Sequence, residues 1–274
     1  TVEAVAATLL VSAFPIAVEH SVEVMPEQGV LTAFLAGLYF FERHLVGGRT
    51  RTLVAAAAGF GLMLLTKPTS GFLLLAPLGL YWSQRGTLRG LFPRYALVGV
   101  ACAVPLLAWL VHVWRVNEAS VMDDGRTAAV LAIDNYLNQH DRWTLLATAE
   151  TYTRFVERLT DAYGGWALLL FVAGSALCLS RGGKNRALIG CWLVALLLYF
   201  LVLPFNTTTH AYYTHPYAPL IAVGAASAVG WLVKAGTRLV PGAGHPLVQA
   251  TLALAALLGT LQAHRGYAPP FSRE

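Results

Sequence analysis

The sequence predicts an all-α protein: a polytopic bundle of transmembrane helices with one long extracytoplasmic loop that carries amphipathic surface helices. Composition is the first observation. The 274 residues are 57% hydrophobic and 12% charged, whereas a soluble domain has about 25% charged residues. The second observation is that apolar runs suited to crossing about 30 Å of hydrocarbon recur along the chain. We therefore expect residues 1–274 to form one membrane domain.

Apolar length and helix-breaking residues delimit about nine candidate spans. They are 2–18, 30–45, 53–65, 71–82, 95–114, 166–179, 188–203, 217–233 and 247–261. The third and fourth spans are short, and the turn TKPTS at 66–70 joins them. The connection 115–165 is the predicted extracytoplasmic loop, and it holds eight of the fourteen acidic residues.

Lysine and arginine residues collect in alternate connections between the spans. Eleven of them fall on one side: Arg43, Arg49, Arg51, Arg85, Arg89, Arg94, Arg181, Lys184, Arg186, Lys234 and Arg238. Because cytoplasmic loops carry an excess of Lys and Arg, this side is predicted to face the cytoplasm from the inner or plasma membrane. The short connections on the other side contain one basic residue, Lys67, which points to an extracytoplasmic working face. The net charge of +5 therefore reflects orientation and does not indicate nucleic-acid binding.

The second half of the long loop has the period of an amphipathic helix. Its apolar side chains recur at steps of four and three residues, at Leu145, Ala149, Tyr152, Val156 and Leu159. Two arrangements produce this stripe: a helix that lies on the outer membrane surface, and a helix that packs over the bundle.

Lys67 is one of three lysines, and it stands in LTKPTSGF between two apolar runs. Pro68 and Gly71 break the helix there, which places Lys67 at the outer end of its span. A lysine costs about 2.5 to 3.5 kcal/mol at the centre of a span and much less at an end, where its ammonium reaches the interface. An ammonium at that depth suits a phosphate group held among lipid headgroups. A lysine that only contacts bulk headgroups explains the same position.

A short outer loop, NTTTHAYYTHPYAPL at 206–220, is rich in histidine and tyrosine. Its members are His210, Tyr212, Tyr213, His215 and Tyr217. Interfacial aromatic belts account for part of this cluster, but two histidines and three tyrosines in eight residues exceed what a belt requires. Such side chains can bind a phosphate, a sugar or a metal. Asn206 also begins a sequence that matches a glycosylation sequon.

Carboxylates for catalysis or for a metal occur in two outer segments. They are EHSVEVMPEQ at 19–28, with His20, Glu23 and Glu27, and MDDG at 122–125, with Asp123 and Asp124. Inverting sugar transfer needs a carboxylate base that deprotonates the acceptor hydroxyl. A divalent metal bound by histidines of the 206–220 loop, such as His210, would also need carboxylates from elsewhere, such as Glu19, Glu23 or Glu27 with His20. Solvated loop carboxylates explain the same residues, and the sequence leaves metal dependence open.

The order of these features resembles the polyprenyl-phosphate-sugar-dependent glycosyltransferases of the GT-C superfamily. The segments that carry the resemblance are VMPEQGVLTAFLAGLYFFER, GFGLMLLTKPTSGFLLLAP, the long outer loop and HAYYTHPYAPLIAVGAA. The nearest types are the protein O-mannosyltransferase-like enzymes and the lipid A aminoarabinose transferase. The resemblance implies a hexosyl- or pentosyltransferase of the cell envelope. Such an enzyme moves a sugar, with inversion, from a polyprenyl (dolichyl or undecaprenyl) phosphate carrier to an acceptor protein, lipid or glycan.

The resemblance also implies roles for particular residues. Those implied to bind the lipid phosphate of the donor are Lys67, Tyr212, Tyr213 and His215. Pro26-Glu27 matches a Pro-acidic turn that some relatives carry. In the long loop, Arg126 and Arg142 are candidates for phosphate contact.

One family feature is not found in the sequence. The family's catalytic aspartate lies in the first outer loop, and the count of spans assigns 2–18 to the family's third span. We therefore expect the catalytic residue upstream of Thr1, so that this fragment would bind the donor without catalysing. The alternative function is a transporter or flippase for a polyprenyl-linked or anionic substrate. That class would place charged or helix-breaking residues near mid-membrane in paired halves.

Overall fold

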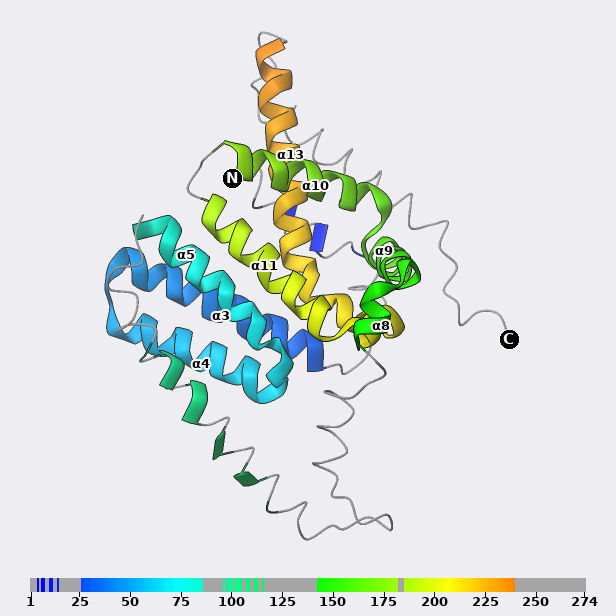
Figure 1. The fold of residues 1–274 in the computed structure, drawn as a ribbon. Coiled ribbons are helices and arrows are strands. Elements are labelled where there is room, and N and C mark those ends of the chain that lie inside the picture. The colour runs from blue at the N-terminus through cyan, green and yellow to red at the C-terminus, as the bar shows by residue number, and fades with distance from the viewer. Residues whose placement is uncertain are drawn as a thin grey trace.

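The computed structural model describes residues 26–85, 142–181 and 185–239, together with individual residues between 4 and 14 and between 96 and 115. The part of the chain so described is helical and contains no β-strand (Figure 1). The predicted all-α class is therefore confirmed.

The first described segment is a helical hairpin followed by a bent third helix. Its elements are α3 (Pro26–Gly47), α4 (Thr50–Thr66), the 3₁₀ helix η2 (Pro68–Leu74) and α5 (Leu75–Arg85). Gly48 has a φ of 67° in the turn between α3 and α4, a backbone conformation that favours glycine. His44 Nδ1 lies 3.0 Å from the Arg49 carbonyl oxygen across that turn. The chain therefore reverses across two residues, Gly48 and Arg49, and α4 packs along α3.

The second described segment supplies the rest of the bundle. Its elements are α8 (Arg142–Ala147), α9 (Ala149–Tyr163), α10 (Gly165–Ser180), α11 (Arg186–Val202), α12 (Pro204–Thr209), the 3₁₀ helix η3 (Ala211–Tyr217) and α13 (Ala218–Leu239). α11 packs against α5, which joins the two segments into one bundle. Phe34 of α3 meets Trp192 of α11 edge to face at 5.3 Å between ring centroids, and both rings are buried in the core.

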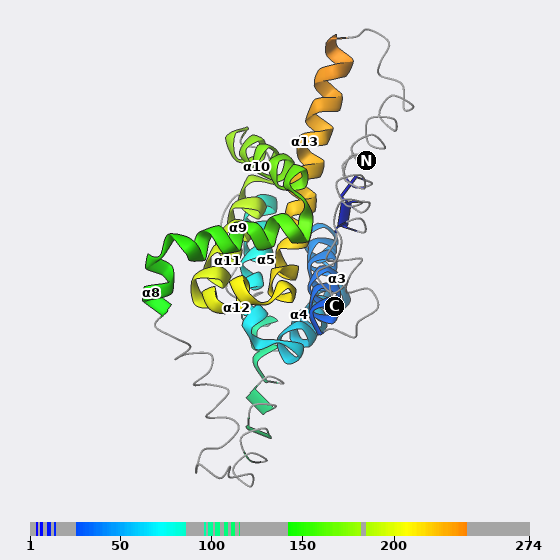
Figure 2. The same cartoon turned by 90° about the vertical axis from the view of Figure 1, so that its right-hand side faces the viewer.

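Glycine allows α10 and α13 to pack very closely. A Cβ atom on Gly174 of α10 would overlap the carbonyl oxygen of Gly224 in α13. Small residues at a helix crossing let two backbones approach, as is common between membrane helices. In Figure 1 and Figure 2 the last turns of α13 extend beyond the other labelled helices.

The described helices agree with six of the nine predicted spans. Two of them are long and apolar enough to cross a membrane, Pro26–Gly47 and Ala211–Arg238, and the pair α9 and α10 forms a third if it is one broken span. α4 and α11 have 17 residues each, fewer than the roughly 20 that a perpendicular span needs. The predicted number of nine is thus not confirmed. The predicted spans 2–18, 95–114 and 247–261 lie largely or wholly outside the described residues.

The predicted amphipathic helix differs in detail from the observed one. The chain breaks at Thr148, so that Leu145 belongs to α8 and the rest of the stripe to α9. Tyr152 and Val156 are 45% and 57% exposed, whereas Phe155 and Leu159 pack against the core. The break separates Leu145 from the other four residues of the stripe. Within α9, packing turns the face with Phe155 and Leu159 towards the core, so the buried face is rotated from the predicted one. α9 packs over α12, α10 and η3 and then bends by 103° into α10.

Contacts between the ends of neighbouring helices show which helix termini lie together at each end of the bundle. At one end, Arg85 Nη2 at the end of α5 donates to the Leu45 carbonyl of α3 at 3.0 Å, and Gly79 of α5 approaches Ala187 at the start of α11. Arg49 and Arg51 lie at this same end, in the α3–α4 turn. We call it the basic end. The opposite end contains the start of α3, the end of α4 and η3, and we call it the Lys67 end.

Candidate functional site

A largely buried ion pair lies at the Lys67 end. Lys67 Nζ is 2.8 Å from Glu27 Oε1, and the two side chains are 12% and 5% exposed. Glu27 lies in the first turn of α3 and Lys67 directly follows α4. The antiparallel hairpin therefore brings together two residues that are 40 positions apart in sequence.

The local sequence holds Lys67 at this point. The residue before a proline is biased towards extended backbone, and Lys67, which precedes Pro68, has φ −152° and ψ 97°. Its N–H donates to the Met63 carbonyl at 3.0 Å, which closes the last turn of α4. The Ser70 hydroxyl donates to the Lys67 carbonyl at 2.5 Å, which starts η2. Lys67 is thus the single extended residue between two helical segments.

Two tyrosine rings from η3 surround the ammonium. Lys67 Nζ lies 3.8 Å from the centroid of the Tyr213 ring and 5.6 Å from that of Tyr212. A cation within about 6 Å of an aromatic face is attracted by the ring quadrupole. Tyr213 is buried and Tyr212 is half-buried. The structure therefore brings Lys67, Tyr212 and Tyr213 together, and their role in binding the donor phosphate stays a prediction.

The two histidines of this loop lie beside the cluster in different ways. The His210 ring stacks on Tyr212, with 5.3 Å between centroids and an interplanar angle of 18°. His215 is 4% exposed within η3, two residues after Tyr213. His210 thus extends the aromatic surface outward, while His215 belongs to the packed interior of η3.

Hydrogen bonds fix η3 against its neighbours. The Tyr163 hydroxyl, at the end of α9, donates to the Thr214 carbonyl, and the Tyr217 hydroxyl donates to the Leu196 carbonyl of α11 at 3.0 Å. The four residues that form these two hydrogen bonds are all buried. The rings under Lys67 are therefore presented by a rigid support.

Sequence reasoning missed Arg158, which joins α9 to the same region. Its Nε donates to the Thr208 carbonyl at 3.2 Å and its Nη2 to the Thr209 carbonyl at 3.4 Å, at the end of α12. A cation there complements the negative end of the α12 dipole. Arg158 is one of several charged residues in an amphipathic helix, so its type alone does not mark it as functional. Its position beside Phe155 and Leu159, which face the core, is the sequence feature that could have indicated a contact with the bundle.

The structure does not assemble a metal site among the residues that it describes. No group of three or more His, Cys, Asp or Glu side chains there is arranged to hold a metal ion. Glu27, considered for such a site, pairs with Lys67, and its Oε2 accepts no hydrogen bond from a described residue. Arg142 begins α8, which packs against α12. Further candidates lie outside the described residues: His20, Glu23, Asp123, Asp124 and Arg126.

The glycosylation sequon does not stand on an accessible loop. Asn206 is 7% exposed and Thr207 is fully buried, both within α12. The Thr207 hydroxyl donates to the Leu203 and Pro204 carbonyls of its own helix. These residues are structural parts of the turn that leads into η3.

Comparison with known proteins identifies a family for the first part of the chain. Residues 1–109 match the family model described as dolichyl-phosphate-mannose-protein mannosyltransferase. The match supports membership of the GT-C type of glycosyltransferases. Both Glu27 and Lys67 lie inside the matched region, whereas Tyr212 and Tyr213 lie outside it. No curated protein and no solved structure matches the chain significantly.

The resemblance read from the sequence is thereby confirmed at the level of the superfamily. The family indicates a membrane glycosyltransferase of the mannosyltransferase type that uses a polyprenyl-phosphate sugar. Apolar helices of spanning length agree with an integral membrane protein.

Proposed function

We propose that this GT-C-type protein transfers a sugar, with inversion, from a polyprenyl monophosphate carrier to an acceptor at the extracytoplasmic face of the membrane. The observation that carries the proposal is Lys67, whose side chain is 12% exposed and lies between Glu27 and Tyr213. It lies inside the segment that matches the family, and it stands at the opposite end of the bundle from the basic connections.

Lys67 binds the carrier phosphate in this proposal. An ammonium has three N–H donors, and one of them is directed to Glu27 Oε1. The other two are then available to phosphate oxygens of the donor. Tyr212 and Tyr213 hold the ammonium at the depth of lipid headgroups, where tyrosines are enriched, and His215 supports them from within η3.

The same contact accelerates the reaction. Transfer breaks the bond between the sugar C1 and the phosphate oxygen, so that a phosphodiester with one negative charge leaves as a monoester that carries a second. A fixed cation beside that phosphate stabilises the transition state more than the ground state, because the charge develops during bond breaking. Lys67 is thus a binding residue whose charge also assists departure of the carrier.

α9 is proposed to lie along the outer membrane surface. Its axis is bent by 103° from that of α10, so that a roughly perpendicular α10 would leave α9 nearly parallel to the bilayer plane. Its inward face packs on the bundle through Phe155, while Tyr152 and Val156 remain exposed. In this proposal α9 combines the two arrangements that its sequence allows, packing over the bundle and lying on the membrane surface. One face contacts the bundle, and the neighbouring exposed apolar residues contact lipid.

Sugar transfer by the complete protein in proteoliposomes tests the proposal. Labelled mannosyl polyprenyl phosphate is the first donor, followed by donors with other hexoses and pentoses, and product is measured in wild type, Lys67→Ala and Lys234→Ala. We expect Lys67→Ala to abolish most of the transfer and Lys234→Ala, at the basic end, to retain it. Full transfer by Lys67→Ala would overturn the assignment of the site. Counterflow of the polyprenyl-linked substrate without any product would instead support the transporter or flippase alternative.

A further inference from the structure

Two aromatic rings, those of His210 and Tyr212, form the accessible rim of the cluster around Lys67. Glu27 and Tyr213 are buried, whereas His210 and Tyr212 are half-buried. The centroid of the Tyr212 ring lies 5.6 Å from Lys67 Nζ. A molecule that reaches the Lys67 ammonium from outside the bundle therefore also meets these two rings, which we call the His210–Tyr212 platform.

The two rings of the platform are nearly parallel but offset. Their centroids are 5.3 Å apart and their planes differ by 18°. Aromatic carbons in direct contact are about 3.5–4.0 Å apart, so a centroid distance of 5.3 Å means that one ring is displaced sideways over the other. Each ring thus covers only part of the other, and the pair presents more aromatic surface than one ring alone.

Backbone hydrogen bonds hold the platform in place. The His210 N–H donates to the Asn206 carbonyl at 3.0 Å, and the Tyr213 N–H donates to the His210 carbonyl at 3.1 Å. His210 is therefore fixed between α12 and η3, and Arg158 Nη2 donates to the Thr209 carbonyl directly before it at 3.4 Å. A surface that is ordered in advance loses little conformational entropy when a ligand binds.

The connectivity of the proposed donor limits what can lie on the platform. A phosphate on Lys67 carries two substituents, the sugar and the polyprenyl chain, and a single oxygen joins each of them to phosphorus. The sugar ring must therefore lie among the side chains nearest to Lys67. A sugar has C–H groups on its faces and hydroxyls at its edge, which suits aromatic carbon combined with a few polar atoms. His210 offers a nitrogen donor and a nitrogen acceptor, and Tyr212 offers a phenol.

The exposed residues next to Lys67 in sequence suit a sugar less well. The Thr66 hydroxyl donates to the Leu62 carbonyl of its own helix at 2.8 Å, and Pro68 has no polar atom in its side chain. An apolar ring such as that of Pro68 is a better neighbour for the first isoprenyl unit of the chain. The distribution of polar atoms therefore favours the platform for the sugar.

We propose that the His210–Tyr212 platform is the sugar subsite of the donor, on which the sugar ring stacks while its phosphate contacts Lys67. The inference rests on the proposed function, because the phosphate on Lys67 fixes where the sugar lies. The platform then determines which donor sugars are accepted, since a site that hydrogen-bonds hydroxyl groups rejects a sugar that lacks them.

Native mass spectrometry of the complete protein in a neutral detergent tests the subsite. Two ligands with the same prenyl chain are titrated separately: mannosyl polyprenyl phosphate and polyprenyl phosphate without a sugar. The variants are His210→Leu, which removes the outer ring of the platform, and Lys67→Met, which removes the phosphate contact. Thermal melting of each variant without ligand checks that it folds.

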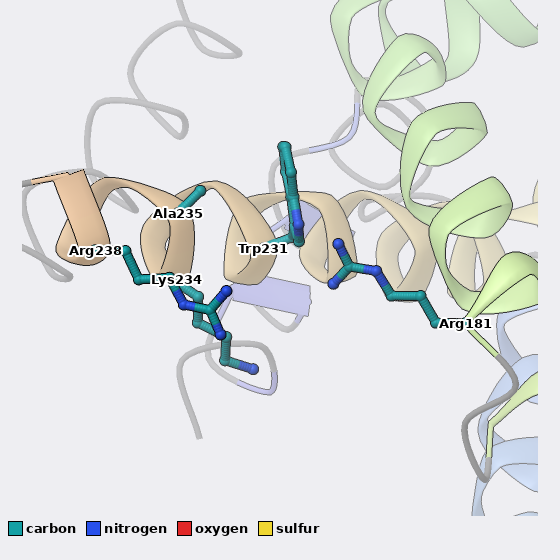
Figure 3. Close-up of a pocket in the computed structure, with 5 residues that line it drawn as sticks. All are labelled: Arg181, Trp231, Lys234, Ala235 and Arg238. Carbon is teal, nitrogen blue, oxygen red and sulfur yellow. The ribbon is translucent and has the colours of Figure 1, made fainter.

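The matched control is Trp231→Leu at the basic end. Figure 3 shows Arg181 reaching from the end of α10 towards the Trp231 ring of α13. The guanidinium carbon of Arg181 lies 5.7 Å from the centroid of that ring, close to the 5.6 Å between Lys67 and Tyr212. Trp231 is exposed, so the control removes an accessible ring beside a cation at the other end of the bundle.

We expect His210→Leu to weaken binding of the mannosyl donor about 3- to 10-fold and to change binding of the sugar-free phosphate less than twofold. Lys67→Met should weaken binding of both ligands, and Trp231→Leu of neither. If Lys67→Met behaves in this way but His210→Leu affects both ligands equally, or neither, the sugar subsite is wrong and the phosphate site stands. A loss in Trp231→Leu equal to that in His210→Leu would also overturn the subsite. Unchanged binding of both ligands by Lys67→Met would overturn the phosphate site itself, and the subsite with it.

Discussion

The ring of Tyr213 lies beneath the ammonium of Lys67, with 3.8 Å between Nζ and the ring centroid. Lys67 follows α4 and Tyr213 belongs to η3, so this contact joins the first helical hairpin of the bundle to the segment that leads into α13. It also crosses the boundary of the family match, which ends at residue 109. The lysine that the matched region supplies is thus held in place by a part of the chain beyond the match.

Substitutions of Tyr213 separate the role of the ring from that of the hydroxyl. Tyr213→Phe retains an aromatic face below Lys67, whereas Tyr213→Ala removes it. Because a partly desolvated cation–π contact contributes about 0.5–2 kcal/mol, we expect Tyr213→Ala to weaken donor binding by about 2- to 30-fold and Tyr213→Phe to change it less. The measurement is the KM for the polyprenyl-phosphate sugar in proteoliposomes. Equal losses in both variants would show that the hydroxyl, and not the ring, is what matters.

The Glu27–Lys67 pair predicts a strong coupling between two charges. Removing one partner leaves the other buried and uncompensated, which costs about 3–5 kcal/mol. We therefore expect Glu27→Gln and Lys67→Met each to lower the unfolding free energy clearly, and the double variant to recover much of the loss while remaining inactive. Unfolding by denaturant in mild detergent gives the four free energies of this cycle.

The exposed pair of Glu150 and Arg154 on α9 is the matched control for that cycle. Its side chains are 69% and 63% exposed at positions i and i+4, so we expect Arg154→Gln to cost about 0.5 kcal/mol or less. If the two pairs show the same coupling energy, the Lys67 ammonium is hydrated in solution. That result would contradict the low exposure of the Glu27–Lys67 pair in the structure.

Sequence patterns predicted helices well wherever a breaker follows an apolar run. Pro68 ends α4 at Thr66, close to the predicted end at residue 65, and the prediction of a lysine at a helix end is confirmed. The prediction of a simple turn at 66–70 is incomplete, because Pro68 also starts the 3₁₀ helix η2. A proline at the first helical position is compatible with several helix types, and packing against α4 and α11 selects among them.

The ion pair at the site could not be predicted in the same way. The sequence patterns indicate acidic or metal chemistry for Glu27 and phosphate binding for Lys67, and they do not indicate that the two residues pair. Their pairing depends on how two antiparallel helices are aligned, which hydrophobic periodicity does not determine to within one turn. The inward face of α9 is missed for a related reason. Phe155 and Leu159 also lie on one face of the helix, and it is packing against the bundle that turns this face inward.

The contact of α10 with α13 at Gly174 leaves no room for a larger side chain. A Cβ atom there would overlap a backbone carbonyl, which cannot rotate away. Overpacking of this kind costs about 1–3 kcal/mol, so we expect Gly174→Ala to lower the melting temperature. Gly236 of α13 is the control, because a Cβ there meets nothing within 4 Å. Gly236→Ala should be neutral or stabilise by about 0.5–1 kcal/mol through helix propensity. Equal effects of the two alanines would contradict the close packing.

Single cysteines test which end of the bundle faces outward. In a background with Cys102, Cys178 and Cys191 replaced by serine, we expect Arg154→Cys on α9 to react with a membrane-impermeant maleimide in intact cells. Arg186→Cys at the basic end should react only after permeabilisation. Both positions are exposed in the structure, so a difference between them reports sidedness and not burial. The reverse pattern would place the Lys67 site in the cytoplasm and exclude the proposed location of transfer.

The rotated face of α9 predicts how this helix meets the membrane. Arg154 and Val156 are both exposed and lie about 200° apart around the helix. If α9 lies on the membrane surface, Val156→Cys is covered by lipid and Arg154→Cys is not. We therefore expect the maleimide to modify Arg154→Cys several times faster than Val156→Cys in proteoliposomes. The difference in rate should become smaller when a short-chain detergent replaces the lipid. Detergent molecules exchange rapidly with solution, so the thiol of Val156→Cys is exposed to the maleimide more often. Equal rates in both environments would show that α9 stands in water above the membrane and packs on the bundle alone.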